Sequence, residues 1–336
     1  MKYLKDPHNN ADPNDFEGYA ALREGAAVVD RSDRIILRLA GRDPIGMLNA
    51  VLTNDVPAHV DRGIYAMLLD PKGRIQTDLR VVKAPDEILI DTEPEGAEAA
   101  REILARYAPF SRVRLDDLSG SWSVLGVYGP LAAELIGNPD LAEHETTRAE
   151  IGGVSVLVVG VAVPVSGYDL IGPPEALAAA CEHLIETGAT TAGTNAYETA
   201  RIEAGVPRFG ADITSENFPG ESENSLERAV DFGKGCYPGQ ETVARMHYRG
   251  SPNKKLYRFE LEPGPMEPPE AGDEILQGEK KLVGPISSES VVGWLTSVAP
   301  PQLDDKVYAL GYLARKADLQ APMRTEDAKV LASKPA

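Results

Sequence analysis

Cysteine and histidine are scarce in this 336-residue sequence. The two cysteines, Cys181 and Cys236, cannot form a disulfide framework, and they are too few for a four-cysteine metal site. The five histidines stand at positions 8, 59, 144, 183 and 247, without the spacing of metal ligands. The composition therefore predicts no metal site and favours the reducing environment of the cytoplasm.

Basic residues are also scarce relative to acidic ones. The chain has 34 Lys and Arg against 52 Asp and Glu, which gives a formal net charge of −18. Such a chain repels a phosphate backbone as a whole, so an anionic partner would need a local basic patch. The charge therefore indicates against a nucleic-acid partner.

An apolar leader and an uninterrupted membrane span are missing as well. The first 18 residues are polar and acidic, where a signal peptide needs an apolar region. Residues 151–168 carry no charge, but glycines and a proline interrupt this valine-rich segment. Two short buried strands are the better interpretation, so we expect neither export nor membrane insertion.

Several motifs of cofactor chemistry do not occur. The sequence has no Walker A loop, no G-x-G-x-x-G between a strand and a helix, and no H-E-x-x-H. These absences indicate against the nucleotide-binding and metalloprotease classes that the motifs mark.

Strand and helix patterns alternate from about residue 28 to residue 230. Residues 34–41 have the β-branched composition of a strand, and Asp43 and Pro44 begin a helical pattern that runs to residue 55. Residues 63–92 contain two turn sequences and predict an antiparallel meander of three strands. Further amphipathic helices are predicted over 95–110, 173–189 and 195–207.

Local signals predict how these helices begin and what they bury. Thr92 and Glu95 form a possible capping box for the helix over 95–110, and Asn195 is the expected N-cap of the helix over 195–207. Cys181 lies on the apolar side of the helix over 173–189. We interpret it as a small core residue without chemistry.

The composition changes at about residue 253. Short strand patterns separated by Pro and Gly predict a small, barrel-like β domain. We therefore divide the chain into residues 1–250 and residues 251–336. The last twenty or so residues are predicted to form a loosely held tail.

Two carboxylates are candidates for binding or catalysis. Glu203 falls in the last turn of a helix, where the macrodipole disfavours a negative charge, and it could accept two parallel hydrogen bonds from a pterin-like ring. The alternative is a solvated residue paired with Arg201 or Arg208. Asp78 is predicted to lie on a strand, on the face opposite Ile75, Thr77 and Leu79. It is either exposed to solvent or faces an amine nitrogen of a ligand.

The segment KGCYPGQETVAR, residues 234–245, carries the strongest local signal. Its glycines and proline permit a tight backbone course and the close approach of a ligand. Lys234, with Arg245 further along, is a positive neighbour of the kind that lowers a thiol pKa, so Cys236 is a candidate reactive thiolate. The alternative is a buried, inert cysteine.

A basic tract follows this segment. No acidic residue occurs between Glu241 and Glu260, while five positive residues do: Arg245, Arg249, Lys254, Lys255 and Arg258. An anionic tail, such as the glutamyl carboxylates of a folate, would be attracted there. Binding of tRNA is a weaker interpretation, because the tract is short and contains no interleaved stacking aromatic residues beyond Tyr248 and Tyr257.

These segments together resemble a known family. RIEAGVPRFGADI, KGCYPGQETVAR and GWLTSV with ALGYLAR resemble the YgfZ-type folate-binding proteins, which are relatives of the glycine-cleavage T protein, an aminomethyltransferase. The resemblance implies an α+β cloverleaf of two intertwined α/β subdomains, within residues 1–250, followed by a C-terminal β-barrel. It also implies a central tetrahydrofolate site.

The resemblance assigns roles to single residues. Glu203 would hold the pterin ring, and Asp78 would face the reactive nitrogens of the folate. The signature loop would be formed by Lys234, Cys236, Gln240, Glu241 and Arg245. The family role that it implies is support of iron–sulfur cluster assembly or repair, with effects on tRNA-modifying enzymes that carry clusters.

Departures from the aminomethyltransferases favour the accessory branch. Those enzymes show two adjacent aspartates where this chain has Thr77 and Asp78, and they lack the KGCYPGQE segment. The leading hypothesis is a tetrahydrofolate-binding accessory protein whose Cys236 acts with an iron–sulfur partner protein, since one thiolate cannot hold a cluster. The alternatives are a true aminomethyltransferase and a non-catalytic binding module, so enzymatic activity is left open. We expect Asp78, Glu203 and Cys236 to surround one cavity.

Overall fold

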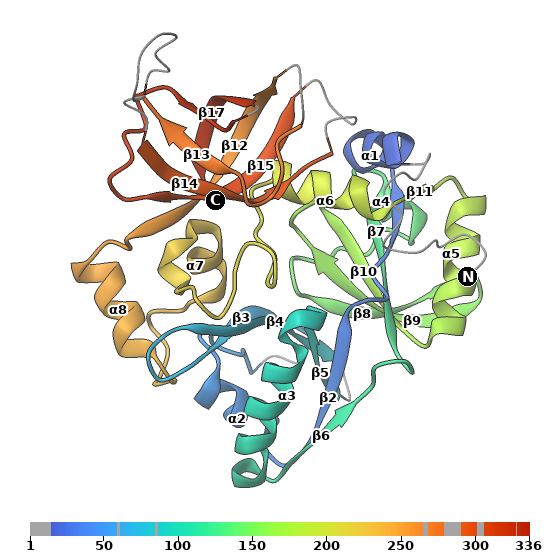
Figure 1. Ribbon diagram of the computed structural model, residues 1–336. Helices are drawn as coiled ribbons and strands as arrows, with labels where there is room; N and C mark the ends of the chain where they lie inside the picture. The colour runs from blue at the N-terminus through green and yellow to red at the C-terminus, as the bar shows by residue number, and fades with distance from the viewer. Residues whose placement is uncertain are drawn as a thin grey trace.

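Two β-sheets with their helices and a closed β-barrel surround a common centre (Figure 1). The computed structural model describes residues 15–58, 61–84, 87–264, 268–278, 290–300, 306–326 and 328–336. The predicted cloverleaf of two intertwined α/β subdomains and a C-terminal barrel is confirmed. The polar N-terminal segment before residue 15 and the histidines at positions 8 and 59 lie outside the described residues.

The first sheet is antiparallel and has the strand order β3-β4-β5-β2-β6. Its first three strands are the predicted meander, and β2 is the strand predicted at 34–41. Helices α2 and α3 cover one face and bury a core of Leu, Ile, Val and Ala side chains. The elements are β2 (Ile35–Gly41), α2 (Pro44–Val51), β3 (Ile64–Leu69), β4 (Ile75–Ala84), β5 (Glu87–Thr92), α3 (Pro94–Tyr107), η1 (Ala108–Ser111) and β6 (Val113–Asp117).

The predicted start of α2 is confirmed, and that of α3 is wrong. Asp43 caps α2, because its Oδ1 accepts a hydrogen bond of 2.9 Å from the Gly46 amide. The N-cap of α3 is Glu93, without a side-chain cap. Thr92 is the last residue of β5, and its hydroxyl instead donates to the backbone oxygen of Asp78 at 2.7 Å. The hydroxyl therefore ties β5 to β4 and is not available to cap the helix.

The second sheet has the order β11-β1-β7-β10-β9-β8. The chain enters it with β1, leaves to build the whole first sheet, and returns with β7, so the two subdomains are intertwined. Strand β1 pairs in parallel with β11 and antiparallel with β7. The elements are α1 (Asp15–Glu24), β1 (Ala27–Asp30), β7 (Ser123–Tyr128), α4 (Ala132–Leu135), β8 (Thr146–Ile151), β9 (Val154–Val161), β10 (Gly167–Gly172), α5 (Pro174–Glu186), β11 (Thr190–Ala192) and α6 (Thr194–Glu203).

The uncharged segment at 151–168 forms β9 and the start of β10, as predicted. Among the described residues, no helix is both long enough and apolar enough to span a bilayer. Cys181 on α5 is buried in the core beneath this sheet, which confirms its interpretation as a core residue. Asn195 does not cap α6: Gly193 is the N-cap, and the Asn195 amide donates to Asp15 at 2.9 Å.

The C-terminal strands form a closed barrel in the order β12-β15-β14-β13-β16-β17. The predicted loose tail is wrong, because β17 pairs with β12 and the last residue, Ala336, is 3% exposed. This pairing closes the barrel, because the edge of β12 that would otherwise be unpaired forms backbone hydrogen bonds with β17. The strands are β12 (Lys254–Pro263), β13 (Glu274–Gln277), β14 (Ser290–Val298), β15 (Val307–Ala314), β16 (Met323–Arg324) and β17 (Ala328–Pro335).

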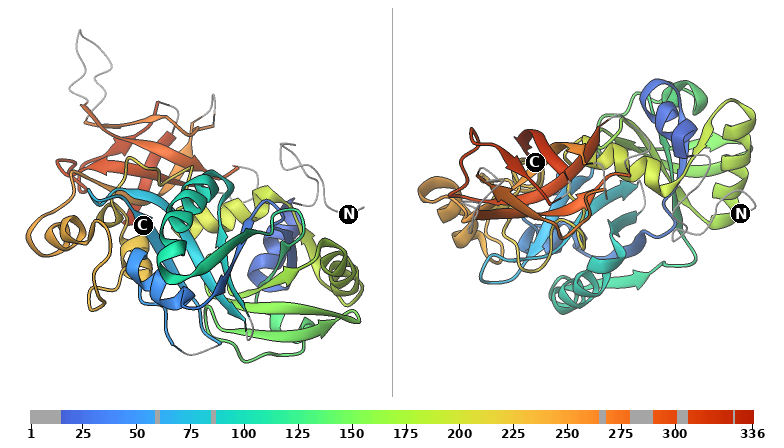
Figure 2. Two further views of the ribbon diagram at one scale, coloured as in Figure 1. Left: turned by 90° about the horizontal axis from the view of Figure 1, so that it is seen from below. Right: turned by 45° about the horizontal axis from the view of Figure 1, so that its top comes forward.

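Three short helices connect α6 to the barrel: η2 (Pro219–Glu221), α7 (Glu223–Ala229) and α8 (Gln240–Arg249). Helix α8 lies at the edge of the molecule in every view (Figures 1 and 2). Only Val243 of its ten residues is buried. The barrel begins at Lys254, while the division into separate domains at residue 250 stays a prediction.

Candidate ligand-binding site and cysteine loop

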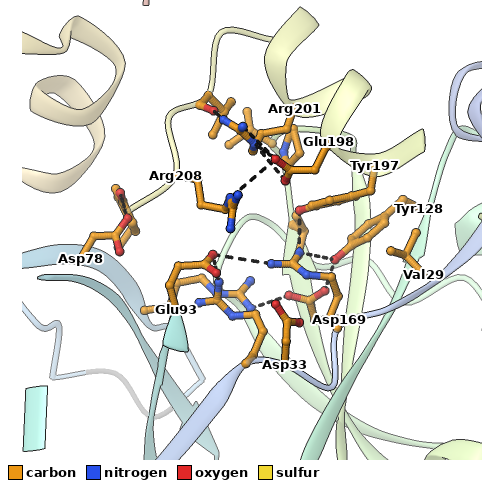
Figure 3. A pocket seen from close by; sticks show the side chains of 18 of the residues that line it. Val29, Asp33, Asp78, Glu93, Tyr128, Asp169, Tyr197, Glu198, Arg201 and Arg208 are labelled. Carbon is orange, nitrogen blue, oxygen red and sulfur yellow. Dashed lines mark hydrogen bonds and ion pairs between the residues drawn. The ribbon is translucent and has the colours of Figure 1, made fainter. Parts of the chain in front are cut away.

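A cavity of about 230 Å³ lies where the two sheets meet α6. Strands β3 and β4 contribute one wall, strands β1, β7 and β10 another, and α6 with the segment after it closes the third side (Figure 3). Its lining is rich in charged and tyrosine side chains. The cavity is therefore suited to a polar ligand with several hydrogen-bonding groups.

Asp78 is the predicted site residue that lines this cavity. Its side chain lies on the face of β4 opposite Leu79, as the period of the strand predicted, and the residue is 7% exposed. The prediction is wrong for Ile75, because a register shift in the β3–β4 pair turns Ile75 to the face of Met67 and Asp78. The Tyr65 hydroxyl on the neighbouring strand β3 donates to Asp78 Oδ2 at 2.7 Å. The hydroxyls of Thr77 and Thr92 hold the backbone oxygen of Asp78 at 2.8 and 2.7 Å. These bonds fix the direction of the carboxyl group.

The Asp78 carboxyl has an unusually high pKa. Burial raises the pKa of Asp78 to about 6, and the negative charge of Glu93 adds to this shift, against the opposing hydrogen bond from Tyr65. Among the described residues, no Arg or Lys forms an ion pair with Asp78. A carboxyl group with a pKa near neutrality can accept a hydrogen bond or hold a proton beside a bound ligand.

The floor of the cavity is a buried network of charges between the two sheets. Arg80, on the same face of β4 as Asp78, donates to Asp91 on β5 and to Asp169 on β10. Burial by itself would raise the pKa of Asp91, but the adjacent guanidinium groups of Arg34 and Arg80 lower it to about 2. Arg80 therefore joins the two subdomains directly beneath the site.

Two tyrosines form the wall opposite Asp78 (Figure 3). The rings of Tyr128 and Tyr197 stack with centroids 5.4 Å apart. The Tyr128 hydroxyl donates to Asp169, and Arg31 donates to the Tyr197 hydroxyl at 2.6 Å. Burial raises the pKa of Tyr128 well above its usual value, so its hydroxyl stays protonated and acts as a donor. These contacts hold both rings in place.

The buried side chain of Arg201 links α6 to the barrel. The Arg201 side chain is 4% exposed and contacts Glu198 at 2.8 Å and Asp212 at 2.7 Å. It also donates to the Ser297 hydroxyl on β14 at 3.1 Å. Glu198 lines the cavity, so the barrel helps to fix a side chain of the site.

Glu203 is not among the residues that line this cavity. It is the last residue of α6, and its carboxylate accepts a hydrogen bond of 2.7 Å from the Tyr19 hydroxyl of α1. Its cationic neighbour is Arg23 at 3.7 Å, so the alternative of pairing with Arg201 or Arg208 is wrong. We expected Asp78, Glu203 and Cys236 to surround one cavity. Asp78 lines this cavity, whereas Glu203 does not.

The cysteine loop also lies outside this lining, but it exposes its thiol. Cys236 is exposed, so the alternative of a buried, inert cysteine is wrong. Lys234 precedes it and donates to two backbone oxygens at the end of α2, those of Asn49 at 2.8 Å and Leu52 at 2.6 Å. Burial lowers the pKa of Lys234. The lysine therefore anchors the loop, and its predicted role as an activating neighbour of the Cys236 thiol stays a prediction.

The other side of the loop is anchored by glycine. Gly239 has φ +81°, and an added Cβ would lie 2.6 Å from the Asp70 oxygen and 2.7 Å from the Gly73 Cα in the turn between β3 and β4. Between the two anchors, Tyr237 is buried and Cys236 faces solvent. The loop therefore presents the thiol on a fixed backbone.

The remaining predicted loop residues lie on α8. Gln240 begins the helix, and Glu241 and Arg245 are exposed on it. None of these residues lines the cavity, and neither do the other positive residues of the tract over 245–258. Their predicted contacts with a folate stay predictions.

The prediction missed several residues of the site, among them Asp169, Glu93, Glu198 and the tyrosine pair. Asp169 did carry a signal, because it is the only charged residue in the apolar stretch over 151–174. A lone acid in such a stretch is rarely buried without a partner. The tyrosines gave no comparable signal.

Comparison with known proteins identifies the family. The family model described as the GCVT N-terminal domain matches residues 3–234, which is more than half of the chain. A protein of Pectobacterium atrosepticum named tRNA-modifying protein YgfZ is 28% identical over 265 residues, covering 76% of each chain. An aminomethyltransferase of Thermoanaerobacter pseudethanolicus is 26% identical over 257 residues, covering 72% of this chain and 69% of its own.

A solved structure shows the same fold. The glycine cleavage system aminomethyltransferase T from Bartonella henselae has a TM-score of 0.74 with 19% sequence identity, and the match covers 95% of this chain and 87% of that one. The resemblance to YgfZ-type proteins and the cloverleaf predicted from the sequence are thus both confirmed. The chain belongs to the GCVT N-terminal domain family.

Proposed function

We propose that this protein binds tetrahydrofolate and, as a cytoplasmic accessory protein of the YgfZ type, supports the assembly or repair of iron–sulfur clusters. The observation that carries the proposal is Asp78, a buried carboxyl group that faces the cavity with Tyr65 as its hydrogen-bond partner. The relatives named YgfZ support the choice of branch. The scarcity of cysteine, with two in the sequence, supports the proposed cytoplasmic location.

The side chains of the cavity fit a reduced pterin ring. Such a ring presents N–H and amine donors, and Asp78 is an acceptor without an ion-pair partner in the described part of the chain. The cavity of about 230 Å³ is smaller than the roughly 300–1,000 Å³ of pockets that enclose drug-sized ligands. It therefore suits the ring, with the rest of a folate extending outside. Bound folate would supply a one-carbon unit, and Asp78 would accept or return a proton beside its nitrogens.

Glu203 remains the predicted second contact with the pterin. To reach the ring, its carboxylate would have to exchange Tyr19 and Arg23 for the ligand. Substitution of Glu203 by Gln tests this assignment. A loss of folate affinity supports a ligand contact, and an unchanged affinity limits Glu203 to holding α1 against α6.

Cys236 would act together with a second macromolecule. Its thiol is exposed on an anchored loop and does not line the cavity. One thiolate is too few to hold a cluster, so ligation would need an iron–sulfur client or assembly protein that supplies the other ligands. Folate binding and the thiol would then be separate parts of one accessory function.

The test separates these two parts. Calorimetry with reduced folates measures binding to the wild type, to Asp78→Asn and to Asp55→Asn, an exposed control. We expect Asp78→Asn to weaken binding by about tenfold or more and the control to match the wild type. Cys236→Ala should bind folate normally but fail to rescue a strain that lacks the protein. Absence of folate binding by the wild type would contradict the proposal and favour a non-catalytic module without this ligand.

A true aminomethyltransferase is the second candidate. The raised pKa of Asp78 favours it, because a group that titrates near pH 6 can serve as a general acid or base. This candidate predicts methylene-tetrahydrofolate and ammonia as products from an aminomethyl-lipoyl carrier protein. Release of ammonia that depends on Asp78 would decide for it, and its absence at saturating folate would decide for the accessory role.

A further inference from the structure

Arg208 differs from the other arginines that line the cavity. Each of the others donates at least one hydrogen bond to a carboxylate or a tyrosine hydroxyl; they are Arg31, Arg34, Arg80, Arg201 and Arg228. Within the described residues, the Arg208 side chain donates none. Its nearest acidic oxygens belong to Glu198 at 3.5 Å and Glu95 at 4.0 Å, beyond good hydrogen-bond distance.

The backbone of Arg208 is fixed by hydrogen bonds, while its guanidinium has only the two long ion pairs with Glu198 and Glu95. Its amide donates to Asp212 Oδ2 at 3.1 Å, and its carbonyl accepts from the Asp212 amide at 2.9 Å. The side chain points into the cavity between Glu198 and Glu93 (Figure 3). It is 33% exposed overall, but its Nε is buried without a hydrogen-bond partner. Buried donors are nearly always paired in native proteins, so the Arg208 side chain has donor capacity that the described residues leave unused.

We propose that Arg208 binds the carboxylate tail of the folate, an inference that rests on the proposed function. A guanidinium group offers a planar fork of donors that matches a carboxylate in two parallel hydrogen bonds. The cavity holds the ring, and the partly exposed position of Arg208 lies where a tail would leave it. Asp78 and Arg208 would then recognise opposite ends of one ligand, the first as acceptor and the second as donor.

This assignment is an alternative to the basic tract predicted from the sequence. The five positive residues of that tract do not line the cavity, and Arg245 and Arg249 are exposed on the peripheral helix α8. Arg208 is separated from the tract by more than thirty residues in the sequence, and the fold brings it to the cavity instead. A competing contact for Arg208 is a ring carbonyl of the pterin, which the experiment below distinguishes.

The experiment compares two ligands by calorimetry. One is folinate, a stable reduced folate with its tail, and the other is a tetrahydropterin without the p-aminobenzoyl-glutamate tail. The proteins are the wild type, Arg208→Gln, Arg208→Lys and the control Arg106→Gln, at an exposed position of α3 outside the cavity lining. We expect Arg208→Gln to weaken folinate binding by about tenfold or more, to leave tetrahydropterin binding unchanged, and Arg208→Lys to recover part of the loss. Arg106→Gln should bind both ligands like the wild type.

Other outcomes overturn the inference in different ways. Equal losses for both ligands would place Arg208 on the ring, and unchanged folinate binding would remove it from the site. In both cases the proposed function stands, because the wild type binds folate. Failure of the wild type to bind either ligand would instead overturn the proposed function and the tail assignment with it. Retained tetrahydropterin binding also shows that each variant is folded.

Discussion

The hydroxyl group of Tyr65 donates a hydrogen bond of 2.7 Å to Oδ2 of Asp78 across the β3–β4 pair. This bond stabilises the ionised carboxylate, while burial and the charge of Glu93 favour the protonated form. The pKa near 6 results from this opposition. The Tyr65–Asp78 pair therefore sets the protonation state that a ligand would meet in the cavity.

Replacing Tyr65 with Phe should raise the pKa of Asp78 further, because the substitution removes the donor that favours the charged form. The carboxyl band in an infrared pH titration measures this pKa, with the Asp78→Asn variant identifying the band. Tyr107→Phe, at the C-terminal end of helix α3 and outside the cavity lining, is the control and should leave the titration unchanged. A pKa that stays or falls in Tyr65→Phe would show that the hydroxyl does not govern Asp78.

The ionised Asp78 carboxylate should lower the free energy of unfolding at neutral pH. Its pKa is about 6 in the folded state against an ordinary value of 3.8, so the folded state binds more protons between these values, and stability falls as pH rises through them. Asp78→Asn removes this loss. We expect the variant to gain about 2–3 kcal/mol over the wild type at about pH 7 and little at about pH 4.

Urea unfolding at the two pH values measures this difference. The exposed control Asp55→Asn should change the free energy of unfolding by less than about 0.5 kcal/mol at both. A gain of the same size at both pH values would mean that the substitution acts through packing and not through ionisation.

Gly239→Ala should destabilise the cysteine loop by about 1–3 kcal/mol, because the new methyl group would meet backbone atoms of the β3–β4 turn at a positive φ. Gly235→Ala in the same loop is a matched control, since an added Cβ there meets no atom within 4 Å. Thermal or urea unfolding compares the two. Equal effects at the two positions would contradict the contact of the loop with the turn.

Arg80→Met should destabilise the protein by about 3–5 kcal/mol, since it leaves two almost fully buried carboxylates, Asp91 and Asp169, short of their shared cation. The exposed Arg114→Met is the control, with an expected change below about 0.5 kcal/mol. The double variant Arg80→Met with Asp169→Leu should recover part of the loss. A cost of less than about 1 kcal/mol for Arg80→Met would argue that the link between the sheets adds little.

A thiol reagent should label one cysteine in the native protein and two after unfolding. Cys236 is exposed, whereas Cys181 is packed in the core under the second sheet. Counting released chromophore with Ellman's reagent measures this, and Cys236→Ser should abolish the native reaction. Native labelling of both cysteines, or of neither, would contradict the positions that the structure gives them.

Local structure followed from local sequence in most places. The period of two in β4 correctly set Asp78 opposite Leu79, and Asp43 correctly marked the start of α2. The same period failed for Ile75, because a register shift against β3 turns that residue to the Asp78 face. The glycines and lysine around Cys236 correctly indicated a constrained loop with an accessible thiol. Predictions failed where a side chain had a more distant partner: Thr92 and Asn195 bond to Asp78 and Asp15 and not to the start of a helix.

The sequence by itself determined most strands and helices, the family and the constrained course of the cysteine loop, because these depend on residue periodicity and on short contiguous motifs. Only the tertiary structure decided which acids share the cavity, which of its arginines donates no side-chain hydrogen bond within the described residues, and that the final strand closes the barrel. Arg80 and Asp169 lie 89 residues apart in sequence, and their contact exists only because two sheets pack against each other. Such contacts depend on the free energy of the whole fold, and no short segment encodes them.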